Sequence, residues 1–233
     1  MCFTVEINLS REAIEQRFGA RFDPKANFKP GYVVSAFEFP EMPVITGEEP
    51  DTIHTFRWGL IPSWIKDSKG AMDIRKKTLN ARSETLVDKP SFRNAVKSSR
   101  CLIPAHGFFE WQTRGKEKLP YYIRLKDNSV FAFAGIYDKW INPENQEEVF
   151  TFSLITTRAN PLLEKIHNLK KRMPVILNPV TEEEWIKPTN KLDKALQYLQ
   201  PLDDSLLKAY PVSKVVSPAN PNRNSPEAIE PLS

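Results

Sequence analysis

The strongest constraint on the fold is a succession of short aromatic and β-branched runs, which extends from about residue 30 to residue 177. Each run has the length of a strand, and proline, glycine, asparagine or aspartate separates it from the next. Twenty prolines against eight glycines fit many turns and strand edges. The expected strands cover residues 32–39, 52–58, 101–111, 121–125, 130–140, 149–156 and 173–177, with a hairpin tip at Asp127 and Asn128.

Short helical segments are expected between and around these strands. Ser10 is a suitable N-cap for a helix over residues 11–18, which Gly19 ends. Thr181 and Glu184 form a capping-box pattern at the start of a helix over 181–186. Further helices are expected at 91–97, 160–167 and 191–199. No repeat or linker divides the chain, so we expect one α+β domain over residues 1–233 on a mixed or closed sheet, with an irregular tail at 217–233.

Composition narrows the class of protein. In 233 residues, 40% of them hydrophobic, no run approaches the roughly 20 apolar residues that span a bilayer, and no signal-peptide pattern opens the chain. We therefore expect a cytoplasmic protein with no membrane partner. Cys2 and Cys101 are the two cysteines, so neither a structural disulfide nor a zinc cluster is expected. The net charge of +4 permits a polyanionic partner without requiring one.

Cys2 stands directly behind the initiator methionine. Removal of Met1 would leave an α-amine beside a thiol, a 1,2-aminothiol that condenses with an aldehyde to a Schiff base and then to a thiazolidine. An α-amine has a pKa of about 7.7–8.0, so part of it is neutral and nucleophilic near pH 7. The alternative is structural, because free cysteine is often a small buried hydrophobe at the start of a strand.

Two segments place polar groups inside otherwise apolar runs. Asn80 opens the sequence Asn-Ala-Arg-Ser-Glu, which can carry a functional amide or simply begin a helix with Ser83 as its cap. Glu110 lies between Phe109 and Trp111, where desolvation would raise its pKa and suit it to general acid–base chemistry. Strand alternation supports the alternative that Glu110 faces water.

Two further segments carry groups suited to nucleic acid. His167 precedes Lys170, Lys171 and Arg172 before a buried-looking strand, an arrangement that fits either a phosphate cradle or a solvated face. The sequence Arg-Trp-Gly-Leu-Ile-Pro-Ser-Trp ends at Trp64, and exposed tryptophans stack on unpaired bases, whereas core tryptophans do not.

Together these segments resemble the SRAP family, the SOS-response-associated peptidases, over nearly the whole chain. The order of the motifs matches as well. The matching stretches are Met-Cys, Trp-Gly-Leu-Ile-Pro, Asn-Ala-Arg-Ser-Glu, Arg-Cys-Leu-Ile-Pro-Ala-x-Gly-Phe-Phe-Glu-Trp, Phe-Ala-Gly-Ile-Tyr, and His followed by Arg-Met-Pro-Val-Ile-Leu. A closing Tyr-Pro-Val-Ser resembles the last strand of the family.

The resemblance implies a single-domain, irregular, antiparallel-rich β-barrel with peripheral helices. It also implies an abasic-site sensor in DNA repair that crosslinks to single-stranded DNA as a thiazolidine. Cys2 would supply the amine and thiol after self-processing that removes Met1. Asn80 would orient the N-terminal residue, and Glu110 would shuttle protons. His167 would help the sugar open to its aldehyde, and a lyase-type activity is a further implication.

The resemblance also implies the partner and its contacts. The residues expected to contact phosphates are Arg82 and Arg172, together with Lys170 and Lys171. Trp58 is the main candidate for stacking on a base, and Trp64 is a second one. No metal or cofactor is expected. The protein would be a bacterial, cytoplasmic monomer that associates with the nucleoid when bound to DNA.

The chain departs from the family pattern in two places. Phe3 and Thr4 follow Cys2 where the family usually has Gly-Arg, which removes a phosphate contact. The loop between His167 and Arg172 is longer than usual, so His167 lies either at the sugar or displaced from it. Two other functions remain open: a cysteine peptidase with a Cys2, His167 and Asn80 set, and a non-covalent single-strand binding module.

Overall fold

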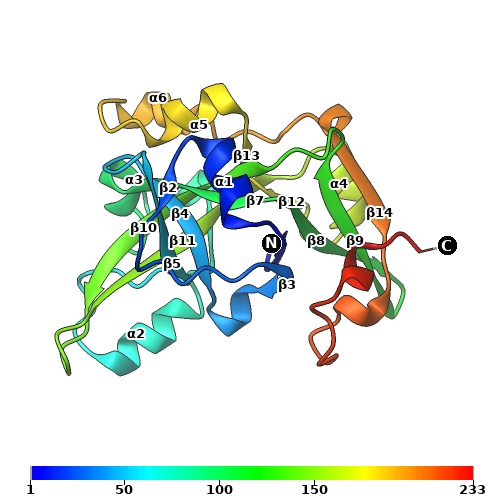
Figure 1. Ribbon diagram of the computed structural model, residues 1–233, viewed down its shortest axis with the longest axis horizontal. Coiled ribbons are helices and arrows are strands. Elements are labelled where there is room, and N and C mark those ends of the chain that lie inside the picture. Colours follow the sequence, from blue (N-terminus) through cyan, green and yellow to red (C-terminus); the bar gives the residue numbers. More distant parts are fainter. Residues whose placement is uncertain (1, 233) are drawn as a thin grey trace.

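The structure is a computed structural model that describes residues 2–232. Its centre is a closed five-stranded barrel (Figure 1). Neighbouring barrel strands pair antiparallel, and a parallel pairing of β11 with β5 closes the ring. The strands, in order around the barrel, are β4 (Glu41–Thr46), β5 (Thr52–Trp58), β11 (Glu148–Arg158), β10 (Phe131–Ile141) and β7 (Arg100–Ala105). The expected α+β class with an antiparallel-rich barrel is confirmed.

Short strands extend the barrel at its margins. β6 (Asn80–Arg82) pairs in parallel with β11, and β2 (Arg21–Phe22) pairs in parallel with β5. β12 (Arg172–Pro174) lies antiparallel to β11, and β13 (Ile176–Leu177) lies antiparallel to β10. The pairing of β6 with β11 is what brings Asn80 to the edge of the barrel nearest the start of the chain.

A second, fully antiparallel sheet lies beside the barrel, on the right of Figure 1. Its strand order is β14-β9-β8-β1-β3. The strands are β1 (Thr4–Ile7), β3 (Gly31–Ser35), β8 (Gly107–Arg114), β9 (Glu117–Leu125) and β14 (Leu207–Pro211). Because β1 is flanked by β8 and β3, the start of the chain is held inside the second sheet.

The expected strand over residues 101–111 is two strands in two sheets. β7 ends at Ala105 in the barrel, and β8 begins at Gly107 in the second sheet. Only glycine fits at position 107, since a Cβ there would lie 2.3 Å from the ring of Tyr122. The expected hairpin tip at Asp127 and Asn128 is wrong for a related reason: β9 and β10, which flank it, belong to different sheets.

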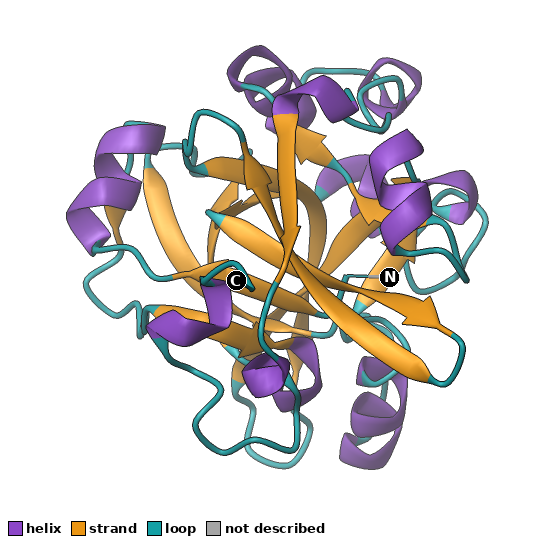
Figure 2. Cartoon of the chain, turned by 90° about the vertical axis from the view of Figure 1, so that its right-hand side faces the viewer, coloured by secondary structure: helices purple, strands orange, loops and turns teal. Residues whose placement is uncertain are grey.

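Helices lie around the strands (Figure 2). They are α1 (Arg11–Phe18), α2 (Ser68–Arg75), α3 (Ala95–Ser98), α4 (Pro161–Ile166), α5 (Pro179–Ile186) and α6 (Leu192–Leu196). The limits of α1 match the prediction, because the Ser10 hydroxyl accepts from the Ala13 amide and Gly19 takes a left-handed φ of 64°. α2 was not predicted. The capping box of α5 joins Asn178 to Thr181, so α5 begins before the expected Thr181.

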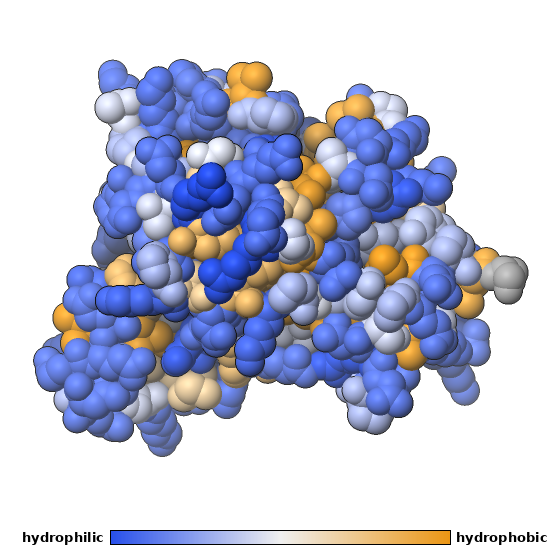
Figure 3. All heavy atoms as spheres, in the orientation of Figure 1, coloured by the Kyte–Doolittle hydropathy of each residue, from blue (hydrophilic) through white to orange (hydrophobic). Residues whose placement is uncertain are grey.

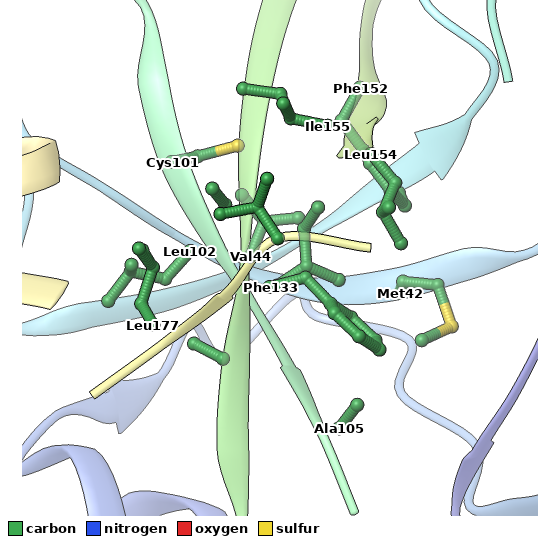
Figure 4. Packing of buried hydrophobic residues seen from close by; sticks show 14 of the residues in the cluster. Met42, Val44, Cys101, Leu102, Ala105, Phe133, Phe152, Leu154, Ile155 and Leu177 are labelled. Carbon is green, nitrogen blue, oxygen red and sulfur yellow. The ribbon is translucent and has the colours of Figure 1, made fainter. Parts of the chain in front are cut away.

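Apolar side chains from the strands fill the barrel (Figure 4). Cys101 belongs to this buried apolar cluster, which makes it a core residue. Cys2 and Cys101 are both buried as free thiols, so no disulfide joins them. In the described part of the chain, no helix has the length and apolar character needed to cross a bilayer.

The surface is mostly polar, and apolar side chains gather near the centre of the face in Figure 3. Residues 217–232 are irregular apart from a 3-10 turn at Pro226–Ile229 and a single antiparallel bridge from Pro231 to Val212. They nevertheless pack against β3, where the Asn224 side-chain oxygen accepts from the Tyr32 and Val33 amides. Ser233, the last residue of the expected tail, lies outside the described residues.

Candidate active site beside the first strand

Cys2 lies two residues before the start of β1 and is fully buried. Its thiol contacts the carbonyl of Thr4 at 3.8 Å. Burial raises the pKa of the thiol well above its ordinary range, and the nearby charge of Glu110 acts in the same direction. Cys2 is therefore a protonated thiol at the junction of the two sheets. Met1, whose removal the resemblance to the family implies, lies outside the described residues.

Asn80 holds the backbone of Cys2. Its side-chain amide donates to the Cys2 carbonyl at 2.9 Å, across a sequence separation of 78 residues. β6 positions Asn80 through its pairing with Leu154 of β11. The Asn80 side-chain oxygen is buried and accepts no hydrogen bond within residues 2–232. Asn80 thus lies on a strand and holds the Cys2 backbone, rather than beginning a helix.

Glu110 is buried on β8, with only 3% of its surface exposed. The neighbouring residue, Phe109, pairs with Thr4 of β1, so β8 brings Glu110 next to the first residues of the chain. Burial raises the pKa of Glu110 to about 7. The alternative that Glu110 faces water is wrong, because Phe109 packs into a smaller apolar cluster on the other side of β8.

His167 follows α4, and its Nδ1 lies 3.7 Å from Glu110 Oε1. The longer loop therefore leaves His167 beside Glu110. His167 Nδ1 also lies 2.8 Å from the carbonyl oxygen of Arg172, which can only accept, so Nδ1 carries the proton. Burial lowers the pKa of His167, which favours the neutral ring with its lone pair on Nε2. Such a ring is suited to act as a base near neutral pH.

A cavity of about 390 Å³ opens beside Glu110 and His167. Glu110 and His167 face it from one side, and Pro218 of the C-terminal segment contributes to its wall. Other lining residues include Phe3, Phe37, Trp111, Lys118 and Lys170. An acid near its pKa and a neutral histidine at the edge of an open cavity can move protons to and from a bound molecule.

Two expected DNA contacts are corrected by the structure. Trp58 is only 1% exposed and donates from its indole nitrogen to the Leu79 carbonyl at 2.7 Å, so it offers no ring face to a base. Arg172 is buried, and its guanidinium binds both carboxylate oxygens of Glu84, at 2.5 and 2.9 Å. That guanidinium is therefore already occupied by an anionic partner within the chain.

The remaining expected DNA contacts are exposed, but they do not form one cluster. Lys170 lines the cavity, whereas Lys171 lies 4.0 Å from Glu164. Arg82 is exposed on β6, two residues beyond Asn80 and so on the same face of that strand. Trp64 is 51% exposed in the loop before α2 and does not line the cavity.

Sequence reasoning missed several cavity residues. Phe37 is 62% exposed at the cavity, and its ring centroid lies 4.8 Å from that of Phe3. Lys118 reaches the same cavity from β9. No spacing in the sequence joins these positions, because β1, the turn after β3, and β9 meet only through the pairing of the second sheet.

The two sheets place Asn80 and Glu110 beside the buried Cys2, and His167 beside Glu110, and this combination of fold and site defines the class of protein. The model of the SOS response associated peptidase (SRAP) family matches residues 1–219. The chain belongs to this family.

Curated relatives agree with this assignment. The chain is 43% identical over 221 residues to the abasic site processing protein YoqW of Bacillus subtilis, and the match covers 94% of each chain. It is 32% identical over 200 residues to the abasic site processing protein HMCES of Gallus gallus, covering 76% of this chain and 56% of the relative.

Solved structures share the fold. A crystal structure of a protein from Bacteroides thetaiotaomicron superposes with a TM-score of 0.93 at 37% identity, and the match covers 100% of both chains. A crystal structure of a protein from Bordetella bronchiseptica superposes with a TM-score of 0.77 at 27% identity, covering 91% of this chain and 100% of the other.

Proposed function

We propose that this protein recognises abasic sites in single-stranded DNA and links to them covalently through Cys2 once Met1 is removed. The names of its relatives support abasic sites as the substrate. The observation that carries the covalent step is the gathering of Asn80, Glu110 and His167 around Cys2.

The chemistry follows from the groups present. The α-amine of Cys2 attacks the aldehyde carbon of the ring-opened sugar, and the carbinolamine loses one water to form an imine. The sulfur then adds to the imine carbon, the thiol proton ends on the nitrogen, and a thiazolidine closes with the net loss of one water. Glu110, with a pKa of about 7, can donate the proton that water loss requires and accept one when the amine attacks.

His167 has a separate task in this proposal. Most of an abasic sugar is a closed hemiacetal, and opening it requires removal of the proton from the anomeric hydroxyl. The neutral His167 ring, with its proton on Nδ1, has a basic Nε2 for this step. We also propose that the residues around Cys2 remove Met1. A lyase-type reaction on the captured sugar is a further part of the proposed activity.

One experiment tests the covalent step directly. The mature protein is incubated with a single-stranded oligonucleotide that carries one abasic site, and products are separated under denaturing conditions. A one-to-one adduct is expected for the wild type and none for Cys2→Ala, with intact mass reporting the loss of Met1. Adduct formation by Cys2→Ala at the wild-type level would refute the proposal.

The peptidase alternative is less well supported. A cysteine protease needs a thiol with a lowered pKa beside its histidine, whereas burial and Glu110 raise the pKa of Cys2. Turnover of peptide substrates that depends on the Cys2 thiol and ignores abasic DNA would favour that alternative. The non-covalent binding module predicts DNA binding that survives Cys2→Ala with no adduct in any variant.

A further inference from the structure

An aromatic pair, in which one ring is exposed and the other partly buried, stands at the rim of the candidate active site. Phe37 is 62% exposed, although large apolar side chains are mostly buried in this chain. Its ring lies against that of Phe3, with centroids 4.8 Å apart and planes inclined by 39°. Both rings line the cavity that Glu110 and His167 face.

The pair is held by its backbone. The Ala36 amide donates to the Phe3 carbonyl at 2.8 Å, which ties the 3-10 turn Ala36–Glu38 to the residue behind Cys2. The Ser35 hydroxyl accepts from the Phe37 amide at 3.4 Å and caps this turn. Phe37 therefore presents its ring from a fixed position and does not need to be ordered when a ligand arrives.

We propose that Phe3 and Phe37 form a stacking platform for a nucleobase next to the abasic nucleotide, an inference that rests on the proposed function. A strand that lacks one base leaves its neighbour without a stacking partner on that side. An exposed aromatic ring replaces this partner without reading the base, because every base offers a flat π-face.

Charge around the cavity fits the same occupant. Lys118 and Lys170 line the cavity together with the aromatic pair, so cations for the backbone phosphates stand beside an apolar surface for a base. An apolar protein partner would gain nothing from those lysines. The stacking platform also adjoins the residue that would hold the sugar, because Phe3 directly follows Cys2 in the chain.

The test separates stacking from covalent chemistry. Equilibrium binding is measured on single-stranded oligonucleotides in which a tetrahydrofuran replaces the abasic sugar, because this analogue has no aldehyde and forms no adduct. One oligonucleotide keeps normal flanking bases, and a second carries tetrahydrofuran at both flanking positions too. Removal of the flanking bases is expected to weaken wild-type binding about tenfold.

Phe37→Ala is expected to bind the first oligonucleotide about tenfold more weakly than the wild type and to bind the second as the wild type does. Phe37→Trp should restore the dependence on flanking bases. Ile141→Ala, which removes another exposed apolar side chain on β10, serves as the matched control and should change neither affinity.

Several results would overturn the platform. One is that Phe37→Ala loses affinity equally for both oligonucleotides, and another is that it loses affinity for neither. A third is that the wild type binds both oligonucleotides with the same affinity. Self-association that Phe37→Ala abolishes, together with unchanged DNA affinity, would assign the pair to a contact between copies instead. The proposed function has its own test. When the Phe37→Ala protein is present at a saturating concentration, it should still convert all of the true abasic DNA to the denaturation-resistant adduct.

Discussion

The side-chain amide of Asn80 donates to the carbonyl of Cys2 at 2.9 Å, and this one hydrogen bond joins the edge of the barrel to the first residues of the chain. The Cys2 thiol contacts the Thr4 carbonyl of β1 at 3.8 Å, so Cys2 is held from both sheets. The Asn80 bond fixes the backbone carbonyl of Cys2 and so contributes to the orientation of its amine and thiol.

Asn80→Ala removes this bond, and we expect adduct formation with abasic DNA to slow about tenfold or more. The free energy of unfolding should fall by about 1–3 kcal/mol, the usual cost of a lost buried hydrogen bond. Asn190→Ala is the matched control, because Asn190 also donates to a backbone carbonyl, that of Glu184, at 2.7 Å. A comparable loss of adduct rate in Asn190→Ala would mean that instability, not orientation, explains the Asn80 result.

Glu110→Gln should change how stability depends on pH. Burial raises the pKa of Glu110 from 4.5 to about 7, so the folded protein binds more protons than the unfolded chain between these values. The contribution of Glu110 to stability then falls as pH rises through this window, by roughly 3 kcal/mol at about 1.4 kcal/mol per pH unit. The variant should lack this fall in denaturant titrations at several pH values.

Glu144→Gln, at an exposed carboxylate, is the control for the pH titration and should keep the wild-type pH dependence. The same Glu110→Gln variant should slow adduct formation about 100-fold, because it can no longer exchange a proton. An unchanged adduct rate would remove Glu110 from the mechanism even if its effect on stability were confirmed.

His167→Ala separates sugar opening from ring closure. We expect it to slow the reaction with abasic DNA about 100-fold or more, the size of a general-base contribution. A simple aliphatic aldehyde needs no ring opening, so its reaction with Cys2 should proceed at the wild-type rate in His167→Ala and slowly in Glu110→Gln. Reaction rates followed by intact mass give both comparisons. Equal slowing of His167→Ala on both substrates would contradict the assigned role.

Substitutions at Trp58 and Trp64 should differ in their effect on the free energy of unfolding. Trp58→Ala should destabilise the fold by about 3–5 kcal/mol, because the buried ring stacks on Phe152 with centroids 5.7 Å apart. Trp64→Ala should change stability by less than about 0.5 kcal/mol. Thermal unfolding measures both. The milder Trp58→Phe should keep full DNA affinity, and a specific loss of affinity at unchanged stability would restore Trp58 as a stacking residue.

Lys170→Ala tests the electrostatic part of DNA binding. One lost phosphate contact should lower the slope of log affinity against log salt by about 0.7 for single-stranded DNA. Lys139→Ala is the control, because Lys139 is an exposed lysine that pairs with Glu148 at 2.9 Å on the barrel. Titrations at three salt concentrations measure the slope, and an unchanged slope for Lys170→Ala would exclude a phosphate contact there.

Local signals in the sequence determined what depends on neighbouring residues. The limits of α1 follow from Ser10 and Gly19, since capping involves groups within one turn. The order of motifs along the chain resembles that of a known family, and it predicted the four residues that the structure brings together. They are Cys2, Asn80, Glu110 and His167. Alternation of side chains along β8, by contrast, supported a solvated Glu110, because alternation does not reveal that both faces of a strand are covered.

Only the tertiary structure decided the rest, because it depends on which strands pair. The run over residues 101–111 is uniformly strand-like in sequence, but its two halves belong to different sheets. The second strand begins at Gly107, where Tyr122 packs too closely for any side chain. Burial of Trp58 and occupation of Arg172 by Glu84 follow from contacts between distant segments. The approach of Phe37 to Phe3 requires β1 and β3 to be neighbours, and no local pattern specifies that pairing.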